Sequence, residues 1–297
     1  MIDFVRVHYN DKSKLETFIK DPNNFEKMFS VLEYHSAEVL YPYKVNLENI
    51  EVVVNEKSGY AKNSIHKLNN LLIEGKEHNH NDFTYSQLCS VIDYLRDNVI
   101  EITNKKLTQL EFGFNLRIPI PAQELISKSV LMHNFDRHSM INKFKGKGYL
   151  MSFEHFNYII KIYDKAKQYK LSNENILRFE IKFLSSKEFN PLGVYNLNDL
   201  KNKEVLENLF DYLLKRFNEL LIVDDYSEDL ISEKDYEKLN MYSSFIFWNK
   251  LNEANKRQVK SNHKKKYLAL LEKHNLQKVK NHLRIQLTEK FNQLLSK

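Results

Sequence analysis

Apolar and polar residues alternate, one by one, along several stretches of the first two thirds of the chain. A period of two is typical of β-strands that bury one face. The pattern predicts strands at residues 1–9, 38–45, 49–56, 107–120, 147–155, 157–165 and 175–183. The last three follow one another with short connections, so we expect an antiparallel meander that supplies the middle of a sheet.

Apolar residues recur at helical spacing in other parts of the chain. Thr84 can cap a helix over residues 85–102, whose apolar stripe should lie on the sheet. Beyond the Pro-Leu-Gly at 191–193 the alternation stops, and helices are predicted at residues 197–223, 236–251, 259–274 and 276–295. An acidic segment at 224–235 separates the first two of these. We therefore expect two regions, an α+β domain at 1–195 and a helical region at 196–297.

Composition narrows the class of protein. The chain has 297 residues, of which 42% are hydrophobic, and this is enough for a sizeable core. It has no run of about eighteen apolar residues, and its amino terminus is rich in acids and polar groups, so we expect a cytoplasmic protein without a membrane span or signal peptide. The single cysteine, Cys89, excludes an internal disulfide and a cysteine-pair zinc site. Any metal must be held by oxygen and imidazole ligands.

Positive charge is concentrated at the carboxyl-terminal end. Residues 256–297 contain twelve Lys or Arg and two Asp or Glu, a net of +10, so the rest of the chain carries −4 of the total +6. Such a segment suits a polyanion such as DNA or RNA, with an anionic membrane surface as the main competitor. Seven cations would lie outside the apolar stripe of the last two helices: Lys260, Lys264, Lys265, Lys266, Lys278, Lys280 and Arg284. A helix-turn-helix-like arrangement and a merely solvated helical face both fit this pattern.

A tyrosine flanked by lysines is the first candidate for chemistry. Lys161 and Lys165 are two residues before and after Tyr163, so all three project from one face of the strand predicted at 157–165. Two cations there would lower the pKa of the phenol and neutralise an incoming phosphate, which suits a nucleophile. The alternative is a solvated Lys-Tyr-Lys face on an edge strand.

Two glutamates alternate with apolar residues and can join this group. Glu111 and Glu180 would emerge on one face of the sheet if their strands are neighbours, and His155 is the nearest imidazole by strand position. Two carboxylates and an imidazole suit Mg²⁺ or Mn²⁺. Alternatively, Glu180 only pairs with nearby cations and His155 is a surface residue.

Two other histidine patterns do not predict a metal site. The His78-Asn79-His80 triplet has no strand pattern around it and is predicted to be a solvated loop. No predicted strand carries a His-hydrophobic-His pair.

Several of these segments resemble one family in both content and order. They are MIDFVRVHY, LEFGFNLRIP, YIIKIYDKAKQY, LRFEIKF followed by PLGVYNLNDL, and FIFWNKLNE. The chain resembles the replication initiators of filamentous phages and their relatives on plasmids and phages, the phage X family. The resemblance implies a tyrosine- and metal-dependent nicking-joining endonuclease that starts rolling-circle DNA replication in a bacterial cell or phage-infected host. It also implies an antiparallel, HUH-nuclease-like sheet with packed helices, followed by the basic helical region.

The resemblance assigns roles to individual residues. Tyr163 matches the nucleophilic tyrosine, Lys165 matches a neighbouring lysine, and Glu180 matches the glutamate of a shared Arg-Phe-Glu strand in which Arg178 can hold phosphate. Glu111 stands where the phage protein has an aspartate. A related plasmid family places its nucleophile on the preceding strand, which makes Tyr149 the alternative. The expected partners are single-stranded and duplex origin DNA and a host helicase, without a membrane. The competing hypotheses are a non-catalytic DNA-binding replication or copy-control protein and an RNA-binding protein.

Overall fold

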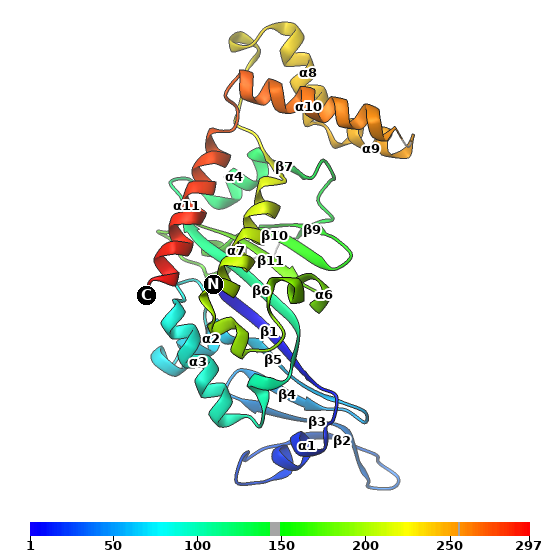
Figure 1. Ribbon diagram of the computed structural model, residues 1–297, viewed down its shortest axis with the longest axis vertical. Coiled ribbons are helices and arrows are strands. Elements are labelled where there is room, and N and C mark those ends of the chain that lie inside the picture. The colour runs from blue at the N-terminus through cyan, green and yellow to red at the C-terminus, as the bar shows by residue number, and fades with distance from the viewer. Residues whose placement is uncertain (143–148, 255) are drawn as a thin grey trace.

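A ten-stranded antiparallel sheet runs through the computed structural model, which describes residues 1–142, 149–254 and 256–297 (Figure 1). The order of strands is β2-β3-β4-β5-β1-β6-β11-β10-β9-β8, and a separate pair joins β7 to β12. The strands are β1 (Ile2–Tyr9), β2 (Phe29–Leu32), β3 (Val39–Leu47), β4 (Ile50–Val54), β5 (Gly59–Ser64), β6 (Lys106–Arg117), β7 (Val130–His133), β8 (Met140–Asn142), β9 (Leu150–Glu154), β10 (Tyr158–Asp164), β11 (Ile176–Phe183) and β12 (Leu220–Ile222).

The described part of the chain has eleven α-helices. They are α1 (Ser13–Lys20), α2 (Ile65–Glu74), α3 (Tyr85–Asn98), α4 (Ala122–Ser129), α5 (Lys165–Tyr169), α6 (Ser186–Phe189), α7 (Lys203–Asn218), α8 (Glu233–Ser243), α9 (Phe245–Glu253), α10 (Arg257–Lys273) and α11 (Lys278–Leu295). None of the helices that the structure describes is both long and apolar enough to traverse a lipid bilayer.

Helices α7 and α11 cover one face of the sheet. Phe114 on β6 contacts Phe210 of α7 and Phe291 of α11 through its ring edges, and Phe179 on β11 contacts Phe217 of α7 in the same way. Because side chains alternate along a strand, the neighbours of these phenylalanines point to the other face. That other face carries the polar residues of β6, β10 and β11.

A second, smaller hydrophobic core lies at the end of the molecule where α8, α9 and α10 gather, at the top of Figure 1. It is built around the buried Trp248. It also includes Met132 of β7 and Leu221 of β12, two strands that pair with each other. The expected division at residue 195 stays a prediction. Helices α7 and α11 belong to the main core together with the sheet, and only the stretch from β12 to α10 belongs mostly to the small one.

Most strands predicted from alternation are confirmed. The strands at the amino terminus and at 38–45, 49–56 and 107–120 are present, and β9, β10 and β11 form the predicted meander. Its predicted place in the middle of the sheet is wrong, because β1 and β6 are central and the meander continues to the edge strand β8. Residues 147 and 148 of the strand predicted at 147–155 lie outside the described residues. The α+β class with an antiparallel sheet and packed helices is therefore confirmed.

The helix predictions are confirmed in part. Thr84 caps α3 through a capping box with Gln87, and α10 and α11 lie close to the predicted 259–274 and 276–295. The helix predicted at 197–223 is wrong in extent, because α7 ends at Asn218 and the chain then pairs as β12. The helix predicted at 236–251 is two helices, interrupted at the extended Ser244.

Candidate active site

Tyr163 occupies the end of β10 on the polar face of the sheet. Its side chain is buried, with 5% of its surface exposed, and its hydroxyl donates to Oε2 of Glu180 at 3.3 Å. Lys165, the first residue of α5, places its Nζ 3.5 Å from the same hydroxyl. The phenol therefore lies between a carboxylate and an amine. The strand predicted at 157–165 ends at Asp164, so Lys165 reaches the phenol from the first turn of α5.

Strand register explains why Glu180 reaches Tyr163. In the antiparallel pair of β10 and β11, Lys161 is opposite Glu180 and Tyr163 is opposite Arg178, so all four side chains share one face. Lys161 Nζ lies 3.0 Å from Glu180 Oε1, and Arg178 Nε lies 2.5 Å from Glu180 Oε2. Burial alone would raise the pKa of the Glu180 carboxyl, but Lys161 and Arg178 outweigh it and hold this pKa well below the usual range. Glu180 is thus ionised although it is buried.

Glu111 comes from β6, the strand next to β11, and completes the pair of glutamates predicted for this face. Its Oε1 accepts from Lys161 Nζ at 3.1 Å and lies 3.1 Å from Lys182 Nζ. Lys161 therefore bridges the two glutamates. Burial would lower the pKa of this ammonium, but Glu180 and Glu111 raise it above its usual value, so Lys161 stays charged.

A third carboxylate, Asp3 on β1, was not predicted from the sequence. Its Oδ2 lies 3.2 Å from Arg178 Nη2 and 2.6 Å from Asn79 Nδ2, and its Oδ1 accepts from the Ser64 hydroxyl. Simple alternation places Asp3 on the same face as Val5, which is in the hydrophobic core. The pairing of β1 with β6 shifts register between Ile2 and Val5, and this irregularity turns Asp3 to the polar face.

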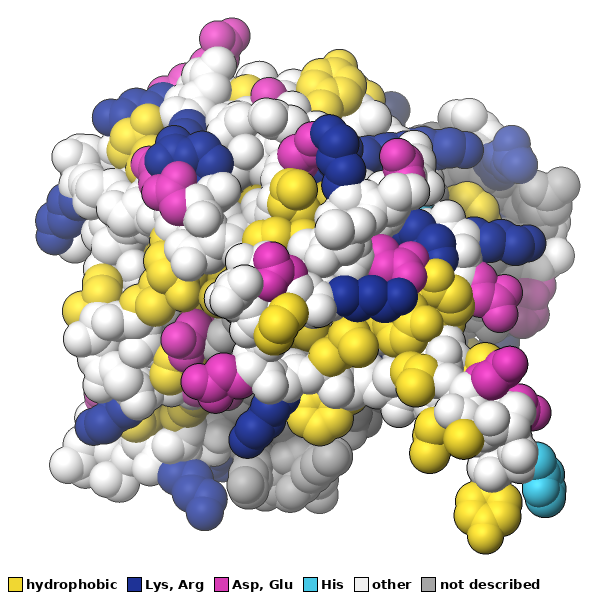
Figure 2. Space-filling view, turned by 90° about the horizontal axis from the view of Figure 1, so that it is seen from below, with side chains coloured by type: hydrophobic (Ala, Val, Ile, Leu, Met, Phe, Trp, Pro, Cys, Tyr) yellow, Lys and Arg dark blue, Asp and Glu magenta, His cyan; other side chains and the backbone are white. Residues whose placement is uncertain are grey.

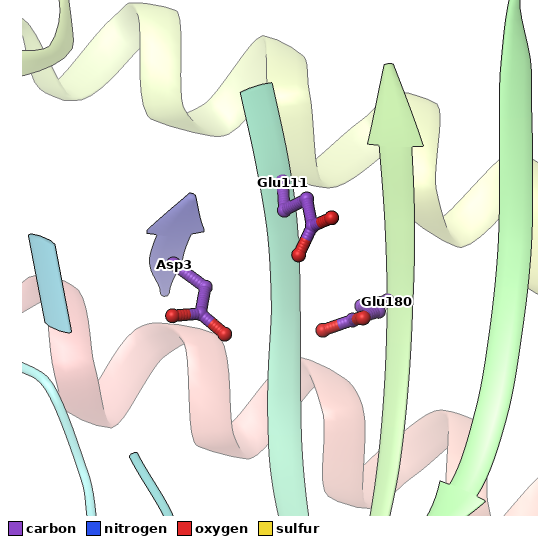
Figure 3. Close-up of side chains that lie close together, drawn as sticks. All are labelled: Asp3, Glu111 and Glu180. Atoms are coloured by element: carbon purple, nitrogen blue, oxygen red, sulfur yellow. The ribbon is translucent and has the colours of Figure 1, made fainter. Parts of the chain in front are cut away.

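Asp3, Glu111 and Glu180 project from three adjacent strands toward one point, with α7 and α11 behind the sheet (Figure 3). One oxygen from each lies within 4.8 Å of the others. Ionised carboxylate oxygens are the ligands that Mg²⁺ and Mn²⁺ prefer. The ammonium of Lys161, which contacts two of the three carboxylates, shows that a cation can be held there. The donor set therefore fits a divalent ion, provided that Lys161 moves aside.

Gly113 on β6 makes room for this cluster. It lies directly opposite Glu180 in the register of β6 and β11, and a Cβ at this position would come within 2.3 Å of the Glu180 Cβ and 2.5 Å of the Phe179 carbonyl oxygen. No side chain fits in that space without displacing Glu180. The glycine in LEFGF is therefore required by the close approach of the neighbouring strand.

The loop that contains His78, Asn79 and His80 is packed over the site. The prediction that this triplet is a solvated loop is wrong for Asn79, which is buried and accepts from Tyr169 Oη at 2.6 Å besides donating to Asp3. The His80 ring contacts the Tyr169 ring edge to face. Asn79 thus joins the loop to both α5 and the acidic cluster.

His155 and Tyr149 lie elsewhere. The His155 ring stacks on Tyr158, and its Nε2 lies 3.1 Å from Nδ1 of His133, so His155 does not fit the role of a ligand beside Glu111 and Glu180. Tyr149 precedes β9 and packs against the main hydrophobic core. Leu150, the next residue, is opposite Tyr163, so alternation directs Tyr149 away from the acidic cluster.

The two groups around the phenol oxygen have opposite pKa shifts. Burial, reinforced by the charge of Glu180, raises the pKa of the Tyr163 phenol well above its usual value, so the predicted lowering is wrong. Burial is also the main cause that lowers the pKa of the Lys165 ammonium to about 7, and the Arg178 guanidinium adds to it. At neutral pH the phenol keeps its proton and the amine beside it is partly neutral.

The cations predicted to bind nucleic acid fall into two groups. Lys265, Lys266, Lys278 and Arg284 are exposed. Four others have partners within the protein. Arg178 is buried in the acidic cluster, Lys260 donates to Asn252, Lys264 donates to Asn134 and lies over the Phe135 ring, and Lys280 donates to the Asn218 carbonyl. The two helices that carry these cations pack in different places: α10 packs with α8 and α9, whereas α11 packs on β6 and α7.

Comparisons with known proteins find similarity to solved structures but not to sequence families. No protein-family model matches the sequence, and no curated protein matches it. The chain is similar to the solved structure described as the rolling circle replication initiator protein from Geobacillus stearothermophilus, with a TM-score of 0.40 and 9% sequence identity. The match covers 79% of this chain and 89% of the initiator chain.

Proposed function

We propose that the chain is a metal-dependent endonuclease that nicks and rejoins DNA through Tyr163 and so initiates rolling-circle replication. One observation carries the proposal: the Tyr163 hydroxyl lies between Glu180 and Lys165, at the edge of a cluster of three carboxylates. A nucleophile, a base and oxygen ligands are the groups that phosphodiester transesterification needs. The order of sequence motifs shared with phage initiators supports the same reaction.

In this proposal Tyr163 attacks the phosphorus of one phosphodiester in origin DNA. A bond forms between the phenol oxygen and phosphorus, and the bond from phosphorus to the 3′ oxygen breaks. Lys165 Nζ takes the phenol proton, and the 3′ oxygen takes a proton from water. The products are a 5′-phosphotyrosine and a free 3′-hydroxyl, and the reverse reaction joins the ends. Lys161 and Arg178 stabilise charge on the phosphate oxygens.

Asp3, Glu111 and Glu180 would hold Mg²⁺ or Mn²⁺ in this proposal. When bound, the ion supplies positive charge that polarises the scissile phosphate. The protein's own part is to release Lys161 from between the glutamates, so that its ammonium is available for the phosphate. Asn79 and Ser64 orient the Asp3 carboxylate through their hydrogen bonds.

DNA would reach the site from the basic part of the molecule. The exposed Lys265 and Lys266 on α10 and Lys278 and Arg284 on α11 are available to phosphates without breaking an internal contact. Single-stranded and duplex origin DNA are the proposed partners, with a host helicase as the protein that extends the opened duplex. In this scheme Lys260, Lys264 and Lys280 have structural roles instead.

The assignment of Lys165 as the base predicts a pH profile. Below pH about 7 the amine is protonated and cannot accept the phenol proton, so the nicking rate should fall about tenfold per pH unit and level off above pH 7. Lys165→Arg keeps the positive charge but cannot accept a proton, and should abolish nicking at every pH. Rates measured from pH 5.5 to 9 check this, with Lys165→Met as the smaller substitution and thermal unfolding as the control for folding. If Lys165→Arg nicks at the wild-type rate, Lys165 only binds phosphate.

A second candidate function is that of a non-catalytic DNA-binding replication protein. The charges in the site favour it, because Lys161, Lys182 and Arg178 already neutralise the three carboxylates without a metal. An endonuclease should form a covalent adduct with a single-stranded origin oligonucleotide in Mn²⁺ and none in EDTA. Binding that is equal in Mn²⁺ and EDTA, with no adduct in either, would favour the second candidate.

A further inference from the structure

Helices α8, α9 and α10 form a three-helix module around the smaller core, at the end of the molecule away from the strands that carry the acidic cluster (Figure 1). Each of the three helices packs against the other two. Residues 254–256 alone separate the end of α9 from the start of α10. In helix-turn-helix modules a turn of about three or four residues precedes the helix that enters the major groove of DNA. The order and spacing of the helices therefore make α10 the candidate for that helix.

One face of α10 is turned toward the module. Tyr267 and Leu271 are fully buried in the smaller core, and the His263 Nδ1 atom lies 2.9 Å from the hydroxyl of Tyr242 on α8. His263, Tyr267 and Leu271 are four residues apart, so they lie one above the other along the helix. The inward face of α10 is thereby fixed, and the face opposite to it is turned to solvent.

The outward face of α10 carries polar side chains of the kinds that bond to base edges. Four residues at positions i, i+3, i+4 and i+7 share this face and are all exposed: Gln258, Ser261, Asn262 and Lys265. The two side-chain amides are neighbours, since Gln258 Nε2 lies 3.5 Å from Asn262 Oδ1. Gln and Asn amides bond to adenine through two atoms at once, and Ser and Lys also bond to base edges in the major groove. The face can therefore distinguish one base pair from another.

The charge around this face suits a polyanion. Residues 256–271 include six Lys or Arg and no Asp or Glu. Four of these cations are exposed: Lys256, Arg257, Lys265 and Lys266. At the opposite end of the molecule, Lys and Arg side chains are interspersed with Asp and Glu (Figure 2). The attraction for phosphates is therefore strong at α10, beside the side chains that can bond to bases.

Duplex DNA fits this face better than other nucleic acids do. The major groove of B-DNA is about 12 Å wide and admits an α-helix, whereas the major groove of an RNA helix is too narrow for side chains to read. Proteins that bind single strands stack the bases on exposed aromatic side chains. Along α10, all of which the structure describes, no Phe, Tyr or Trp is exposed.

We propose that α10 enters the major groove of duplex DNA and recognises its sequence, with Gln258 and Asn262 each bonding to an adenine. Arg257 and Lys266, which flank this face, hold the phosphates on either side of the groove. The inference rests on the proposed function only in taking DNA as the partner, and it depends neither on Tyr163 nor on a metal ion. The three-helix module then selects the origin, and the acidic cluster is the separate place where the strand is nicked.

The test is selection of bound DNA by the full chain from a library of duplexes with a random central segment, in EDTA so that binding is measured without cleavage. Wild type should enrich one motif that contains adenines. Gln258→Ala and Asn262→Ala should each relax the motif at one position and weaken binding of the selected duplex about tenfold, with binding of an unrelated duplex unchanged. Lys266→Ala should weaken binding of both duplexes alike and reduce its dependence on salt.

Asn292→Ala and Gln293→Ala are the matched controls. They truncate the same two kinds of exposed side chain on α11 and should leave the selected motif unchanged. Thermal unfolding checks that each variant is folded. The proposal is overturned if wild type enriches no motif, if a single strand of the selected sequence competes as well as the duplex, or if Gln258→Ala and Asn262→Ala both bind the selected duplex as wild type does.

Failure of this inference and failure of the proposed nicking reaction give different results. An enriched motif without a covalent adduct in Mn²⁺ would refute nicking through Tyr163 and support recognition by α10. A covalent adduct from wild type that enriches no duplex motif would refute recognition by α10 alone.

Discussion

Tyr163→Phe should abolish nicking of a supercoiled origin plasmid while DNA binding stays at the wild-type level. The substitution removes only the hydroxyl oxygen that forms the bond to phosphorus, and loss of a nucleophile typically lowers the rate by about 10⁴-fold or more. The fold should tolerate the change, with a loss of about 1 kcal/mol or less, because Glu180 Oε2 keeps its bond to Arg178. Plasmid relaxation and a gel-shift assay on the same preparation separate the two effects.

Tyr149→Phe is the matched control for this experiment. It removes the same atom from a tyrosine that packs against the hydrophobic core, and should leave nicking unchanged. A Tyr163→Phe protein that still nicks, together with a Tyr149→Phe protein that does not, would transfer the nucleophile to Tyr149.

Glu180→Gln should lower the free energy of unfolding by about 3–5 kcal/mol, the usual cost of removing one partner from a buried ion pair. Glu180 is the partner of both Arg178 and Lys161, and its loss leaves an uncompensated charge in a buried site. The substitution should also abolish adduct formation, because it removes one of the three carboxylates. Urea denaturation followed by circular dichroism measures the first effect.

Wild type and Glu180→Gln should also differ in how strongly the free energy of unfolding depends on pH. The pKa of Glu180 is lower in the folded protein than its ordinary 4.5, so the stability that it contributes is present above pH 4.5 and is lost as the pH falls further. Wild type should therefore lose stability more steeply than Glu180→Gln below pH 4.5.

The control for Glu180→Gln is Glu124→Gln. This substitution breaks the exposed pair with Lys128 and should lower the free energy of unfolding by about 0.5 kcal/mol or less. If Glu180→Gln and Glu124→Gln lose the same free energy of unfolding, Glu180 does not hold the buried cluster together.

The strands that carry the candidate site could be predicted because they are regular. A period of two places Lys161 and Tyr163 on one face, and Glu111 and Gly113 on one face, whichever strands turn out to be neighbours. The meander then brings β10 beside β11, and the site needs only the further pairing of β11 with β6. Five of the predicted residues meet for this reason: Lys161, Tyr163, Arg178, Glu180 and Glu111. Lys165 joins them from the first turn of α5.

Other parts depend on contacts that local pattern does not encode. Asp3 reaches the cluster through an irregular pairing, and Asn79 reaches it through a loop whose position is set by bonds to β1 and α5. The pKa of Tyr163 depends on burial, which outweighs the nearby cations. The apolar stripes of α10 and α11 fit any apolar surface, so their spacing could not show that they pack on different cores.

The most direct test of the central claim is mass spectrometry of the covalent adduct. Wild-type protein is incubated with Mn²⁺ and a single-stranded oligonucleotide that carries the origin, digested with protease and nuclease, and sequenced as peptides. The account predicts a nucleotide joined through its 5′-phosphate to Tyr163. An adduct on Tyr149, or no adduct from protein that binds the same oligonucleotide, would contradict it.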